Sequence, residues 1–154
     1  MTSRSDRLME FLSTEGYRPT LRPDGDIVFK HEGGTFVIRF DPSDDEYLSI
    51  AYPNFWRLTT DAEVTRALRA ANRATVRVKA VKILVFEEYR GVWASVEFFA
   101  ESTSQFETTF SRTLTVLRAG VERFGEEMRA SEPLEDERIA LTREEVMRFK
   151  HGNY

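Results

Sequence analysis

The sequence contains no cysteine and only two histidines, His31 and His151, among its 154 residues. Disulfide bonds, cysteine-based zinc sites and cysteine nucleophiles are therefore excluded from this chain. A histidine-based zinc or iron site would need His, Asp and Glu clustered at ligand spacing, and the sequence has no such cluster. We therefore expect no metal and no cofactor.

Motifs of nucleophilic catalysis and phosphate binding are also missing. No Gly-x-Ser-x-Gly sequence occurs, the motif that places a serine on a strand-to-helix turn. Gly33-Gly34 joins two short strand patterns instead of leading into a helix, so it predicts a turn and not a phosphate loop. Acidic residues cluster at 41–46 and at Glu87-Glu88, in predicted loops where water screens them. The sequence offers no catalytic residue and favours a protein that is not an enzyme.

The chain lacks long hydrophobic runs and an excess of positive charge. No apolar stretch approaches the roughly 20 residues of a membrane-spanning helix, and the first eleven residues lack the pattern of a secretory signal. The net charge of −4 argues against general nucleic-acid binding, which needs Lys and Arg to displace counterions from phosphate. We expect a soluble cytoplasmic protein that binds neither membranes nor nucleic acids.

Helical periodicity predicts three main helices. Residues 5–17 have an apolar face, with Ser3 or Ser5 as the cap and Gly16 as the stop. A capping box at 60–63 begins a second helix that runs to about Arg77. Its apolar stripe consists of Val64, Leu68, Ala71, Thr75 and Val78. A capping box at 104–107 begins a long third helix. Its stripe consists of Phe106, Phe110, Leu114, Leu117, Val121 and Phe124.

Period-two alternation predicts six short strands in two groups. Turn signals at 23–25 and 33–34 divide the first group, which ends with a strand from Tyr47 to Tyr52. The second group is a hairpin, 81–86 and 92–99, with apolar residues on both faces, which indicates a central position or cover on both sides. The predicted fold is α+β, an antiparallel sheet with helices packed on it, in the order α-β-β-β-β-α-β-β-α.

The end of the chain has a different composition. Residues 131–140 are acidic and contain Pro133, which predicts a solvated linker. A capping box at 142–145 and an apolar pair, Leu141 and Val146, predict a short C-terminal helix. We therefore divide the chain into one α+β domain, 1–130, and an acidic linker with a short helix, 131–154.

Aromatic residues are the first candidates for a binding site. The stretch "YPNFWRL", 52–58, is interpreted as a strand-to-helix connection, because Pro53 cannot donate to a sheet ladder and a helix cap follows at Thr60. Large rings at strand ends or on a second sheet face often anchor partners. The candidate partner-binding residues are Phe55, Trp56, Trp93 and Phe99. Core packing is the alternative for each of them.

A second candidate is a run of basic residues without intervening acids. It extends from the second helix into the hairpin and consists of Arg66, Arg69, Arg73, Arg77, Lys79 and Lys82. Such a stripe can meet phosphate or an acidic peptide, although it is also typical of the solvated face of a helix. Arg73 and Lys82 are the candidate anion-binding residues.

The order of elements resembles the YbjN-like family of bacterial proteins, which share the fold of class I type III secretion chaperones. Four segments carry the resemblance: "LMEFLSTEGY", "GDIVFKHEGGTFVIRFD", "ALRAANRATVRVKAVKILVFEE" and "FETTFSRTLTVLRAGVERF". The resemblance covers about Leu8 to Met128 and rests on hydrophobic positions. It implies a small non-enzymatic adaptor, often dimeric in the chaperone relatives, which bind extended segments of client proteins. Members outside secretion systems have been described as candidate sensory-transduction regulators.

Two functions remain open from the sequence. The first is a homodimeric protein-binding, regulatory or chaperone-like module that holds a protein segment on its sheet and helix surfaces. The alternative is a domain that binds a small ligand or an anion in a pocket between the sheet and the long helix, through Arg73 or Lys82.

Overall fold

The computed structural model describes residues 3–131. The predicted acidic linker and C-terminal helix, 131–154, lie outside the described residues from position 132 onward. The three helices are α1 (Arg4–Thr14), α2 (Asp61–Arg77) and α3 (Thr103–Ala130). The six strands are β1 (Thr20–Leu21), β2 (Ile27–His31), β3 (Gly34–Asp41), β4 (Asp44–Arg57), β5 (Lys82–Phe86) and β6 (Gly91–Phe99).

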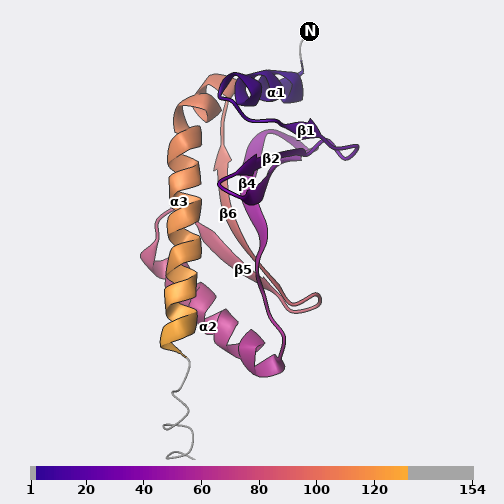
Figure 1. Cartoon of the computed structure of the whole chain (residues 1–154). Helices are drawn as coiled ribbons and strands as arrows, with labels where there is room; N and C mark the ends of the chain where they lie inside the picture. The colour runs from indigo at the N-terminus through magenta and orange to yellow at the C-terminus, as the bar shows by residue number, and fades with distance from the viewer. Residues whose placement is uncertain (1–2, 132–154) are drawn as a thin grey trace, which may run out of the picture.

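All strands belong to one antiparallel sheet with the order β1-β2-β3-β4-β6-β5. The long helix α3 runs along one side of this sheet, with α1 near its first turns and α2 near its C-terminal half (Figure 1). This arrangement confirms the predicted α+β class and the predicted order of elements.

The core lies between the sheet and α3. The predicted stripe of α3 is confirmed: five of its six members are buried and Val121 is partly buried. Alternate residues of β6 supply the sheet side, with Val92 and Ala94 fully buried. The ring of Phe98 stacks near Phe106, with 6.1 Å between the centroids. One face of each central strand therefore packs on the helices, as the alternation requires.

The prediction that 52–58 is a strand-to-helix connection is wrong, because β4 continues to Arg57. The register with β6 shifts between Tyr52 and Trp56, so Pro53 falls in an irregularity where the ladder needs no N–H donor. Asn54 follows with a φ of 51°, a left-handed conformation that asparagine tolerates better than most residues. The proline bends the strand at a bulge instead of ending it.

The predicted apolar stripe of α2 is confirmed only in part: Ala71 is buried and Val64 and Val78 pack partly buried against the core, whereas Leu68 and Thr75 do not. The buried residues are four alanines, Ala67, Ala70, Ala71 and Ala74. Leu68 is 44% exposed, and Thr75 is exposed as well. Helices that pack closely need small side chains at the contact, whereas the sequence pattern gives most weight to large apolar residues. The buried face of α2 is therefore centred on alanines, with Ala67 and Ala74 in place of the predicted Leu68 and Thr75.

Three smaller predictions need correction. The start of α3 has no capping box at 104–107: its N-cap is Ser102, without a side-chain cap, and Gln105 accepts the N–H of Glu101. The predicted acidic loop at 41–46 is a tight turn, because β4 already begins at Asp44. In the second hairpin only β6 is central, between β4 and β5, because β5 forms an edge of the sheet. In contrast, Ser3 forms the full capping box predicted for α1.

Candidate functional site

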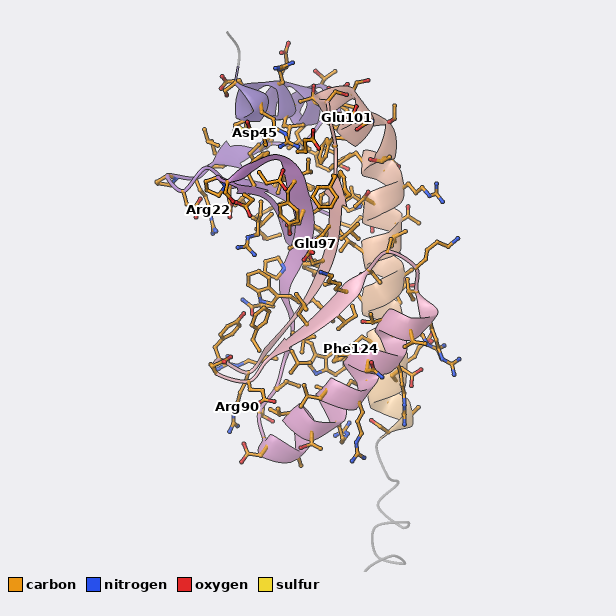
Figure 2. All side chains as sticks on the ribbon, turned by 180° about the vertical axis from the view of Figure 1, so that it is seen from behind. Arg22, Asp45, Arg90, Glu97, Glu101 and Phe124 are labelled. Carbon is orange, nitrogen blue, oxygen red and sulfur yellow. The ribbon has the colours of Figure 1, made fainter. Side chains whose placement is uncertain are left out.

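The face of the sheet turned away from α3 carries the two aromatic candidates of β6, the half-buried Trp93 and the exposed Phe99. Side chains alternate along this strand, so Trp93, Ser95, Glu97 and Phe99 point away from the core that Val92 and Ala94 enter. Figure 2 shows the molecule from this side, with Glu97 near the middle of the sheet. Phe99 is 72% exposed, the most exposed aromatic side chain among the described residues.

Aromatic rings stand at both ends of this face. At one end Tyr47 meets Phe99 edge to face, with 6.1 Å between ring centroids. At the other end Phe86 stacks on Tyr89 at 5.1 Å and contacts Trp93 at 5.2 Å. These ring contacts restrict the rotation of the aromatic side chains. The restriction lowers the entropic cost of ordering the side chains against a partner.

Small residues separate the two groups of rings. Ser49, Ala51 and Ser95 are buried although their face of the sheet carries no helix. They line a hollow of about 380 Å³ that Tyr47, Leu84 and Trp93 border. We call this concavity the sheet hollow. A hollow with a small-residue floor and aromatic borders can accept side chains from another molecule.

A hydrogen bond fixes the orientation of Trp93. Its indole Nε1 donates to Oδ1 of Asn54, 3.2 Å away, in the bulge of β4. A side chain at Gly91 would be obstructed, since a Cβ there would lie 2.4 Å from the same Asn54 oxygen and 2.8 Å from the ring of Tyr89. Glycine at 91 and the left-handed Asn54 thus allow the β4 bulge to position the indole.

Charged side chains on this face are paired. Lys82 Nζ lies 2.5 Å from Oε2 of Glu97, and this hydrogen bond raises the pKa of Lys82. Arg39 lies 3.7 Å from Asp26 at the other side of the sheet. Burial and the nearby Asp24 raise the pKa of Asp26 in spite of that arginine. The exposed apolar rings, and not an excess of one charge, distinguish this surface.

The structure brings only two of the four aromatic candidates together. Trp93 and Phe99 lie on the uncovered face, whereas Phe55 and Trp56 are half-buried on the helix side. The rings of Phe55 and Trp56 each meet the buried ring of Phe124 edge to face, with centroids 5.5 and 5.4 Å away. Packing against α3 accounts for this pair, and their contact with a partner stays a prediction.

The two anion-binding candidates lie apart. Arg73 of α2 approaches Glu127 of α3 at 3.7 Å, beside Arg77 and Arg123, which also contact that carboxylate. Lys82 lies on the uncovered sheet face with Glu97. Each candidate thus has a protein carboxylate as its neighbour, and the two do not form a common site.

Several residues of the uncovered face escaped the sequence analysis. The aromatic borders include Tyr47, Phe86 and Tyr89, and the floor includes Ser49 and Ser95. The available signal was the apolar content on both faces of the second hairpin. It showed that the outward face was unusual, but it did not show which strands would lie beside it.

A second concavity of about 510 Å³ lies where β6 passes α3, and we call it the edge groove. Its strand side is Val96 to Ala100, its helix side includes Thr109, Arg112 and Val116, and Lys79-Ala80 adjoin it. This is the predicted position for a pocket between the sheet and the long helix, but neither Arg73 nor Lys82 lines it.

Within residues 3–131, no group of three or more His, Asp or Glu side chains has the arrangement of a metal site. No helix in the described part of the chain is both long and apolar enough to cross a membrane. His31, the histidine of β2, shares a hydrogen bond between its Nδ1 and the hydroxyl of Tyr17, 3.2 Å away. The contact joins β2 to the segment after α1 and gives this histidine a structural partner.

Comparison with known proteins identifies the fold. No family model matches the sequence, and no curated protein matches it. Solved structures are similar to it, among them the following two. An uncharacterized protein from Methanothermobacter thermautotrophicus has a TM-score of 0.59 at 13% identity, over 83% of this chain and 99% of that one. A chain of the HopA1–SchA chaperone–effector complex has a TM-score of 0.56 at 16% identity, over 77% and 90%.

At these identities the likeness concerns the fold alone. It supports the chaperone-like fold that the sequence resemblance implied, since a chain with this architecture occurs in a chaperone–effector complex. The YbjN-like part stays a prediction, because no family model matches.

Proposed function

We propose that this protein is a non-enzymatic, chaperone-like adaptor that holds a segment of another protein and acts as a homodimer. The observation that carries the proposal is the uncovered sheet face, where aromatic rings border the sheet hollow. Phe99 alone is 72% exposed, and water around such a ring is released when a partner covers it.

The geometry of the face suits a protein segment better than a compact ligand. Its two groups of rings, around Phe99 and around Trp93, are separated by the sheet hollow. An extended segment can cross such a face and place an apolar side chain at each group, while a small molecule would reach only one of them. Aromatic side chains in these positions are typical anchors of protein interfaces.

The structural likeness supports the same proposal. A chain with a similar fold belongs to a chaperone–effector complex. The fold alone does not assign a function, so the argument for this chain rests on its own aromatic face.

Site-specific crosslinking tests the proposal. A photo-reactive amino acid is placed at Phe99 of the full chain, and in a matched control at Val76, which is 76% exposed on α2. After irradiation in the native cellular extract, we expect discrete protein adducts from position 99 and few from position 76. Equal labelling from both positions, or none from position 99, would contradict the proposal.

Sedimentation tests the homodimer separately. We expect a species of twice the 17.9 kDa chain mass at micromolar concentration. A monomer at every concentration would remove the dimer from the proposal and leave the adaptor function in place.

A further inference from the structure

The edge groove exists because β5 is shorter than its neighbour. β5 pairs with Gly91 to Ser95 of β6, and Lys82 is its first residue. The rest of β6, Val96 to Phe99, pairs with β4 on one side only. The chain reaches β5 from α2 through Lys79-Ala80, where Ala80 has a left-handed φ of 64°. The strand position beside the end of β6 is thus left open.

The backbone of β6 presents free hydrogen-bonding groups toward this position. Ala100 N–H donates to Glu46 and Leu58 N–H donates to Arg90, so the even-numbered residues of β6 bond to β4. In an antiparallel strand the intervening residues point to the opposite side. The N–H and C=O groups of Glu97 and Phe99 therefore face the edge groove, and no backbone partner is recorded for them within residues 3–131.

The open end of β6 differs from the other edges of the sheet. The edge formed by β5 already has a hydrogen-bond partner. The outward N–H of Ile83 in β5 donates to the hydroxyl of Thr75 on α2, 3.1 Å away. At the other end of the sheet the edge strand β1 has only two residues. Short or covered edges are how proteins avoid unwanted strand pairing. The end of β6 is neither short nor covered, and it has a groove beside it.

Charge and polarity define what fits the groove. Lys79 and Arg112 line it, both are exposed, and neither forms an ion pair with the described residues. The one carboxylate of the strand side, Glu97, is held by Lys82. On the helix side Thr109 and Thr113 donate their hydroxyls to carbonyls of their own helix, so they offer mainly methyl groups beside Val116.

We infer that the edge groove binds an extended acidic segment of a partner protein, which adds as a strand to β6 beside Glu97 and Phe99. Side chains of an added strand alternate, so one set points toward α3 and the other toward the uncovered face. Acidic residues of the first set reach Arg112 and Lys79, and apolar residues of the second set lie beside Phe99. This inference rests on the proposed adaptor function and specifies the chemistry of its partner.

Titration of the full chain with defined peptides tests the inference. The probes are a six-residue VEVEVE peptide, a VKVKVK peptide of reversed charge, and VEVEVE with alternate backbone amides N-methylated. We expect binding of the first peptide only, because methylation removes the ladder and lysine repels Arg112 and Lys79. Amide hydrogen exchange, followed by NMR, should slow at Glu97 and Phe99 when VEVEVE is added.

Two variant pairs separate the contribution of backbone hydrogen bonds to peptide binding from the contribution of charge. Phe99→Pro removes both the ring and the outward N–H, whereas its control Phe99→Ala removes the ring alone. We expect clearly weaker binding by the proline variant, since the N–H of Phe99 does not serve the β4 ladder. Arg112→Glu should weaken VEVEVE about tenfold and favour VKVKVK, whereas Arg129→Glu, on the same helix but away from the groove, should change neither.

Some results would overturn strand addition at the edge groove without contradicting the proposed adaptor function. Equal binding of the methylated peptide, or unchanged exchange at Glu97 and Phe99, would overturn strand addition. A change in tryptophan fluorescence that Trp93→Phe abolishes, without protection of those amides, would place the peptide on the sheet hollow, overturning this inference but not the adaptor function. Protection of both amides without peptide would mean that the chain itself or a second copy fills the groove, and would also overturn it.

Discussion

Trp93 of β6 and Asn54 of β4 are joined by a hydrogen bond of 3.2 Å between the indole Nε1 and the side-chain oxygen. The bond links the bulge of β4 to the uncovered face of the sheet. A Cβ at Gly91 would lie 2.4 Å from the same oxygen, so the three positions depend on one another.

The stability effects of substitutions at Gly91 and Asn54 should therefore be coupled. Gly91→Ala should lower the free energy of unfolding by about 1–3 kcal/mol, because the added methyl group pushes the Asn54 side chain away from Trp93. Asn54→Gly keeps the left-handed backbone and removes the obstructing oxygen. In the double variant we expect a loss smaller than the sum of the two single losses by about 1 kcal/mol. Urea unfolding measures all three, and strictly additive losses would contradict the coupling.

The ring of Phe124 in α3 should contribute strongly to stability. It is fully buried, and Phe55 and Trp56 contact it from β4. Phe124→Ala leaves a cavity between strand and helix and should cost about 3–5 kcal/mol of unfolding free energy. The control Val76→Ala, at a side chain that is 76% exposed, should cost less than about 0.5 kcal/mol. With Trp93 replaced by Phe in both variants, the fluorescence of Trp56 should shift to longer wavelength in the first variant only. Similar stabilities would show that α3 does not pack there.

The carboxylate of Glu127 should contribute more to the stability of the fold than that of Glu126, its neighbour on α3. The side chain of Glu127 is 10% exposed, and its carboxylate lies 2.8 Å from Arg123, with Arg73 and Arg77 at 3.7 and 4.0 Å. Glu127→Gln leaves three guanidinium groups around a neutral side chain and should cost about 2 kcal/mol, less than for a fully buried pair because two of the arginines are exposed.

Glu126→Gln is the matched control for this change. Glu126 also contacts Arg123, but its side chain is 58% exposed, so we expect almost no loss of stability. High salt should reduce the cost of Glu127→Gln, since it screens repulsion among the arginines. Thermal unfolding of both variants at low and high salt checks this, and equal losses would show that the buried carboxylate has no special role.

The carboxylate of Glu63, at the start of α2, should make the stability of the fold depend on pH. The N–H and hydroxyl of Thr59 donate to its carboxylate at 2.7 and 2.8 Å, and these bonds lower the pKa of Glu63. Because the folded pKa lies below the unfolded one, the stabilisation is present above the unfolded value and is lost as the pH falls through the folded value.

The variant Glu63→Gln should therefore have a lower Tm than the parent near neutral pH, and the difference should shrink in acid. Glu10→Gln, at an exposed position of α1, is the control and should give no such difference. Calorimetry over a pH series measures both. A difference that stays constant with pH would exclude the carboxylate as its cause.

The sequence predicted the order of elements and the main core stripe because both depend on local periodicity. The stripe from Phe106 to Phe124 repeats at helical spacing, and the turns at 23–25 and 33–34 mark strand ends. Local patterns misled where packing was decisive. Pro53 lies inside β4 because a bulge accommodates it, and α2 buries alanines because it packs closely on its neighbours.

The candidate site shows the same division. Trp93 and Phe99 share a face by simple alternation, which the sequence contains. Whether that face would be covered depended on the strand order and on where the helices pack. The same holds for the edge groove: the free amides of Glu97 and Phe99 exist because β5 begins opposite Ser95, four residues short of the end of β6. The sequence by itself determined which side chains share a face, because backbone geometry sets that locally. Only the tertiary structure decided which faces and edges stay open, because contacts between distant segments cover the others.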